Sequence, residues 1–108
     1  MPYIKQEYRD LLDDTIDRLA ETISAISIRP GQGETAYAGM LNYACTRLAM
    51  KIVHIRFGEI RYGTVATITG VFKNVADEFY RRVAATYEDK QIEKSGDVDM
   101  YEKYGSTI

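Results

Sequence analysis

The sequence has little that could build a metal or disulfide site, with one cysteine and one histidine in 108 residues. A zinc site of four cysteine or histidine ligands cannot form within one such chain, and neither can an intrachain disulfide. No stretch approaches the roughly 18 apolar residues of a membrane-spanning helix, and the opening MPYIKQEYRD lacks the apolar core of a secretory signal. We therefore expect a cytoplasmic protein with no metal, no cofactor and no membrane partner.

The charge balance gives no basic field, because the net charge is −2 and the isoelectric point is about 5.4. Nucleic-acid binding by phosphate neutralisation is therefore not expected. The length fits one domain, and 45% hydrophobic with 28% charged residues is typical of a globular chain. Nine tyrosines are unusual here, and their apolar rings with polar tips suit half-buried surfaces and interfaces.

Two long stretches carry apolar side chains at helical spacing. The first predicts a helix over residues 5–27 that ends before Pro30, with the stripe Leu12, Ile16, Leu19, Ile23 and Ile26. The second predicts a helix over residues 36–56, with the stripe Leu41, Cys45, Leu48, Ile52 and Ile55, supported by Ala44 and Ala49. We expect Thr35 to cap this helix, Gly58 to end it, and Cys45 to be a buried, unreactive thiol.

The third segment is ambiguous at its start, because residues 65–71 are rich in β-branched side chains and resemble a strand. A longer helical stripe runs through Val65, Ile68, Phe72, Val75, Phe79 and Val83 to Tyr87. The longer period favours a helix over residues 65–86, capped by Thr64. Gly70 inside that helix is expected where another helix approaches closely.

These patterns predict an all-α fold: a small bundle of three long amphipathic helices in residues 1–87, followed by a polar C-terminal extension in residues 88–108. Ser95-Gly96-Asp97 marks a turn in that extension, and the sequence leaves open whether the extension is ordered or free. An odd number of amphipathic helices leaves an apolar face uncovered, so we expect a homo-oligomer.

Two polar clusters are the candidate ligand-binding residues. One, on the second helix, is formed by Asn42, Tyr43, Thr46 and Arg47. The other, on the third, is formed by Glu78, Tyr80, Arg81, Arg82 and Tyr87. Guanidinium groups bind carboxylates and phosphates, and tyrosine rings stack on planar groups. The simpler alternatives are a buried polar network at the first cluster and surface ion pairs at the second, with Asp77 opposite Arg81 and Glu78 opposite Arg82.

A third candidate surface is acidic, with Asp10, Asp14, Asp17 and Glu21 on one face of the first helix. All-α nucleoside-triphosphate pyrophosphohydrolases hold magnesium with helical carboxylates of this kind. They need a second acidic pair on a facing helix, and the third helix offers only the adjacent Asp77 and Glu78. The acidic face is therefore either a solvated surface or a site for a protein partner, and we expect no catalytic residue.

The sequence resembles a family of small uncharacterised proteins from phages, prophages and bacterial genomes. The resemblance rests on Met1-Pro2-Tyr3-Ile4, residues 41–48 (LNYACTRL), residues 78–83 (EFYRRV), Tyr87-Glu88-Asp89 with Ile92, and Gly96-Asp97-Val98. It implies a phage-type origin and no known reaction. The expected function is non-enzymatic binding that counters host defence by sequestering a nucleotide-like ligand in an oligomer. The alternative is a protein–protein inhibitor of a host defence protein; a pyrophosphohydrolase is disfavoured.

Overall fold

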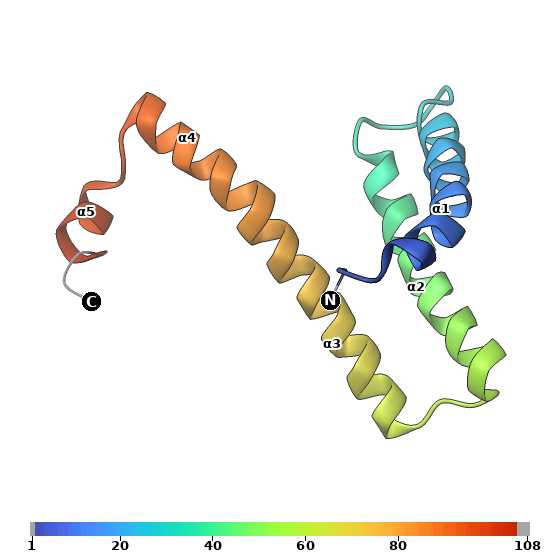
Figure 1. Cartoon of the computed structure of the whole chain (residues 1–108). Helices are drawn as coiled ribbons and strands as arrows, with labels where there is room; N and C mark the ends of the chain where they lie inside the picture. Colours follow the sequence, from blue (N-terminus) through green and yellow to red (C-terminus); the bar gives the residue numbers. More distant parts are fainter. Residues whose placement is uncertain (1, 106–108) are drawn as a thin grey trace. The chain divides into compact units, whose positions relative to one another are not determined.

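The computed structural model describes residues 2–105, in which helices are joined by short loops, with no strand among them. The elements are α1 (Gln6–Ser27), α2 (Ala36–Phe57), α3 (Tyr62–Phe79), the π-helical segment η1 (Tyr80–Ala84), α4 (Ala85–Ser95) and α5 (Asp99–Gly105), as drawn in Figure 1. The chain divides into two units, residues 1–69 and residues 70–108. The predicted all-α class is confirmed, and the bundle of three helices remains a prediction.

In the first unit, α1 packs against α2 as a helical hairpin (Figure 1). Ile23 and Ile26 near the end of α1 share a small hollow with Gly39, Met40 and Ala44 of α2. A Cβ added to Gly39 would meet no atom within 4 Å, so the contact leaves open space at this position. The apolar side chains Leu12, Ile16 and Leu19 of α1 are exposed.

The α2 stripe is not the face that packs, and this part of the sequence interpretation is wrong. Leu41, Leu48, Ile52 and Ile55 are exposed, and so is the thiol of Cys45. The partly buried residues are instead Ala36, Met40, Ala44 and Ala49, and Met40 and Ala44 border the hollow shared with α1. Of the predicted face, only the supporting residues Ala44 and Ala49 are partly buried, whereas its large side chains are exposed.

Val53 is the only buried residue of the described chain, with 3% of its surface exposed. It lies near the C-terminal end of α2 and borders a hollow together with Gly58 and Ile60 of the following loop. A single buried side chain means that most apolar residues of this chain are still exposed to water when it is alone.

The ends of α2 confirm one prediction and correct another. Gly58 follows the helix in the left-handed conformation, with φ +76°, and its N–H donates to the carbonyl oxygen of His54 at 3.0 Å. That geometry closes the helix as predicted, because glycine adopts positive φ without steric cost. Thr35 occupies the N-cap position but forms no side-chain capping bond.

Helix α3 begins at Tyr62, three residues before the predicted start. The Val65 N–H already donates to the Arg61 carbonyl oxygen at 3.0 Å, so Gly63 and Thr64 lie inside the first turn and Thr64 is not the cap. The β-branched residues 65–71 are helical, as the longer period predicted. A Cβ added to Gly70 would meet no atom within 4 Å, so the expected close contact at this glycine is not seen within its unit.

The helical path continues from α3 through η1 into α4 without interruption, ending at Ser95 (Figure 1). Gly96 has φ +85° and marks the predicted turn. The Asp97 carboxylate then accepts the Val98 N–H at 2.7 Å before α5 begins. The extension after residue 88 is therefore helical as far as Gly105. None of the described helices combines the length and apolarity needed to cross a bilayer.

Candidate functional site

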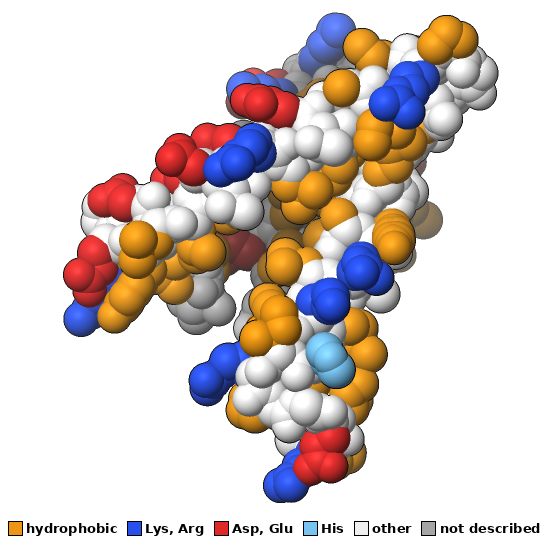
Figure 2. All heavy atoms as spheres, turned by 90° about the vertical axis from the view of Figure 1, so that its right-hand side faces the viewer, with side chains coloured by type: hydrophobic (Ala, Val, Ile, Leu, Met, Phe, Trp, Pro, Cys, Tyr) orange, Lys and Arg blue, Asp and Glu red, His pale blue; other side chains and the backbone are white. Residues whose placement is uncertain are grey.

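A shallow hollow of about 630 Å³ lies along one face of α2, lined by Asn42, Tyr43, Thr46, Arg47, Met50, Lys51 and His54. We call it the α2 groove. All seven residues come from one helix and form two adjacent rows with a spacing of four residues, so they present one continuous strip. Figure 2 shows lysine and arginine side chains together with the histidine on this face, bordered by hydrophobic side chains.

Four of the seven lining residues are the predicted cluster on the second helix: Asn42, Tyr43, Thr46 and Arg47. The other three, Met50, Lys51 and His54, were missed. Their spacing from Tyr43 and Arg47 is helical, so extending the cluster by two turns would have found them. All seven are exposed in the described chain, so no buried polar network is present at Asn42 and Thr46 within the first unit.

The charged side chains of the α2 groove are all basic. Arg47 and Lys51 lie one helical turn apart, no carboxylate lines the groove, and no ion pair joins either cation to an acid within residues 2–105. The Thr46 hydroxyl donates to the Asn42 carbonyl oxygen at 2.8 Å, leaving its oxygen to accept a further bond. The groove therefore offers two unpaired cations, an amide, a ring and a hydroxyl to a ligand.

In the second unit, the predicted arginine cluster is organised around one carboxylate. Glu78 pairs with Arg81, and its other oxygen lies 3.8 Å from the Nε of Arg82. The predicted pair of Asp77 with Arg81 is not formed, whereas that of Glu78 with Arg82 is. Both arginine side chains remain more than half exposed, so each pair contributes at most about 1 kcal/mol. The alternative of surface ion pairs describes this cluster better than a ligand site.

The two tyrosines of this cluster are exposed, but their hydroxyl environments can be distinguished. A hydrogen bond with Glu88 raises the pKa of the Tyr80 hydroxyl, and the negative charge of Glu88 adds to the effect. Both favour the neutral phenol. Tyr80 is thus held by its own helix, whereas Tyr87 stays exposed on the apolar stripe. The two predicted ligand clusters lie in different units.

The acidic face of α1 is fully exposed. Asp10, Asp14, Asp17 and Glu21 all point to solvent, and none forms an ion pair within the described residues. Asp10 accepts a hydrogen bond from the amide of Gln6 at 2.8 Å. No three histidine, cysteine, aspartate or glutamate side chains of residues 2–105 gather into a group that could hold a metal ion.

The fold and site thus define a small all-helical protein with a basic, ligand-sized groove on one exposed helix face. The chain belongs to the family described as a domain of unknown function, DUF6899, whose model matches residues 1–98. No curated protein and no solved structure matches the chain. The match confirms an uncharacterised family over nearly the whole length, including all candidate site residues.

Proposed function

We propose that this protein is a non-enzymatic binding protein that takes a small anionic, nucleotide-like ligand in the α2 groove and works as a homo-oligomer. The observation that carries the proposal is the composition of the groove: Arg47 and Lys51 are the charged groups, and no acid neutralises them. Two adjacent cations with no acid beside them favour the binding of an anion in the groove, although the net charge of the chain is −2.

The other lining groups favour a ligand with both a charged and a planar part. The Tyr43 ring offers a stacking surface, and the Asn42 amide offers donors and an acceptor for polar edges. Met50 supplies a flexible apolar contact, and His54 adds a ring nitrogen at the C-terminal end of the groove. A phosphate beside a heteroaromatic base combines these features in one molecule.

Homo-oligomerisation is supported by the exposed apolar side chains of every long helix. It also gives the groove a second wall, because a strip on one helix covers only one side of a ligand. The sequence resemblance implies a phage-type origin, and in a phage protein such binding would counter host defence. A small protein made in quantity lowers the free concentration of a nucleotide signal in host defence by holding it, without any reaction.

The direct test analyses small molecules carried by the protein from cells. The wild-type chain and two variants, Arg47→Gln and Arg56→Gln, are purified and denatured, and the filtrates are compared by mass spectrometry. Arg56 is the matched control, since it lies on α2 outside the groove. We expect a phosphate-containing compound from the wild type and from Arg56→Gln, and its loss from Arg47→Gln. The same amount from all three proteins contradicts the proposed site.

A second candidate function uses the acidic face of α1 to block a basic protein partner. Its support is the exposure of four carboxylates at Asp10, Asp14, Asp17 and Glu21 with no basic side chain paired to them in the described chain. The double variant Asp14→Lys, Asp17→Lys abolishes inhibition of host defence under this alternative, while Arg47→Gln does not. The groove hypothesis predicts the reverse, so a host-defence assay with both variants decides between them.

A further inference from the structure

The helix that runs from Tyr62 to Ser95 carries one continuous apolar stripe, and most of the side chains in this stripe are exposed. We call it the apolar seam: Val65, Ile68, Phe72, Val75, Phe79, Val83 and Tyr87. We propose that this seam pairs with the same seam of a second copy of the chain. The inference rests on the proposed homo-oligomer and names its interface.

The spacing of the seam is that of a helix made to meet another helix. From Val65 to Phe79 the steps are three, four, three and four residues, the alternation of a coiled-coil seam. A stripe this narrow fits a second helix better than a broad core face, which would need apolar residues at three or more positions in seven. A second copy offers the same spacing and length, so the two seams match by symmetry.

The π-helical segment η1 keeps the seam straight. An α-helix advances about 100° per residue, so two further steps of four residues after Phe79 would turn Val83 and Tyr87 away by about 40° and 80°. The segment η1 spans residues 80–84, between these positions. Its wider turns advance less per residue and remove much of that drift. The segment η1 therefore keeps Val83 and Tyr87 on the same side of the helix as the five preceding seam residues.

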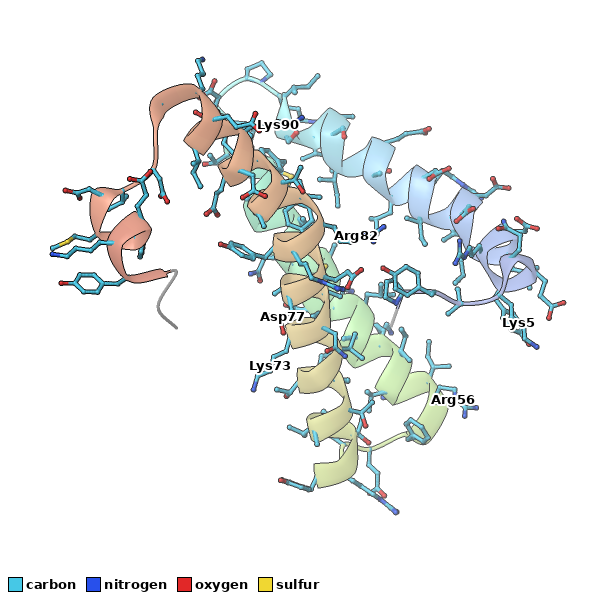
Figure 3. The ribbon with its side chains drawn as sticks, turned by 60° about the vertical axis from the view of Figure 1, so that its left-hand side comes forward. Lys5, Arg56, Lys73, Asp77, Arg82 and Lys90 are labelled. Carbon is cyan, nitrogen blue, oxygen red and sulfur yellow. The ribbon has the colours of Figure 1, made fainter. Side chains whose placement is uncertain are left out.

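The residues beside and behind the seam suit a close contact between identical chains. Ala76 and Ala84 flank it and leave room for a neighbouring backbone. Lys73 and Asp77 lie on the same side of α3 as each other, away from the seam (Figure 3). Glu78, the one acid at the seam's edge, is already paired with arginines of its own helix. No unpaired like charges would therefore face each other across the pair.

The seam exposes enough apolar surface to form an interface. The seam residues with large exposed side chains are between 42% and 63% exposed. Taking roughly 150–200 Å² for each whole residue, the seam exposes about 600 Å² per chain. Complete burial of two seams would cover at most about 1,200 Å² in total, which reaches the lower end of standard specific interfaces. A second copy of the chain can therefore cover most of the exposed apolar surface of the seam.

The test is sedimentation velocity of the full chain with a matched pair of variants, Val75→Glu and Asn74→Glu. Both add the same charge to exposed positions of α3 that are neighbours in sequence, one on the seam and one off it. We expect the wild type and Asn74→Glu to sediment at twice 12.3 kDa or more, and Val75→Glu at the mass of a single chain. Circular dichroism checks that helix content is unchanged.

The outcomes distinguish the proposed interface from the proposed homo-oligomer. If Val75→Glu keeps the wild-type mass, the seam is not the interface, although the protein is still a homo-oligomer. If the wild type itself is a single chain at all concentrations, both proposals are contradicted. Should Val75→Glu lose its helix content, Val75→Ala decides in its place, with at least tenfold weaker self-association expected and unchanged association contradicting the seam.

Discussion

Replacing Val53 with alanine tests whether the C-terminal end of α2 and the loop that follows it pack in solution as described. The substitution removes two methyl groups from the one buried position, where 3% of the residue is exposed. At about 0.8 kcal/mol for each buried carbon, the transfer term is about 1.6 kcal/mol. The space left behind adds to this, so we expect a loss of about 2 kcal/mol. For a chain of this size that corresponds to a melting temperature lower by roughly 10 °C.

The matched comparison is Ile55→Ala on the same helix. Ile55 is 76% exposed, so its truncation removes only about a quarter of a buried side chain's contribution, about 0.5 kcal/mol. Both variants are measured by urea unfolding followed by circular dichroism, at one protein concentration. A cost below about 0.5 kcal/mol for Val53→Ala would refute the reasoning, since the one buried side chain would then not be buried in solution.

Three further outcomes follow from single positions. Gly70→Ala raises the free energy of unfolding by about 0.5–1 kcal/mol in thermal melts, because the added Cβ meets open space; destabilisation would show a helix close by. Gly58→Ala lowers it by about 1–2 kcal/mol, because φ is +76°; an unchanged melt contradicts the left-handed C-cap. Glu88→Gln brings the pKa of Tyr80 down toward its ordinary value, and an unchanged ring-carbon NMR titration refutes the contact. The raised pKa favours the folded state below about pH 10 and ceases to do so as the pH rises through the folded value.

Periodicity predicted the helices well, because spacing, Pro30 and Gly58 act locally. The three-residue error at the start of α3 arose because Gly63 and Thr64 resemble a cap, whereas the backbone there continues the helix to Tyr62. The π-helical turn was not predictable, since no residue type in Tyr80–Ala84 demands it. The turn at Gly96 was predicted from the residue type that positive φ requires.

Which face of a helix packs was harder to predict than where the helix lies. The largest apolar residues of α2 were assigned to the core, but the partly buried residues of this helix are Ala36, Met40, Ala44 and Ala49. A single chain's sequence does not distinguish an apolar stripe used within the chain from one used between chains. The groove residues Met50, Lys51 and His54 were missed for a different reason: only the polar cluster around Asn42 was considered, and not its continuation along the helix.

The central claim is that this chain binds an anionic ligand as an assembly of identical copies. Native mass spectrometry of the wild-type protein, purified from cells without added ligand, measures both parts in one spectrum. The account predicts a multiple of 12.3 kDa carrying a reproducible extra mass of nucleotide size. A clean single chain with no added mass, at every concentration tested, would contradict it.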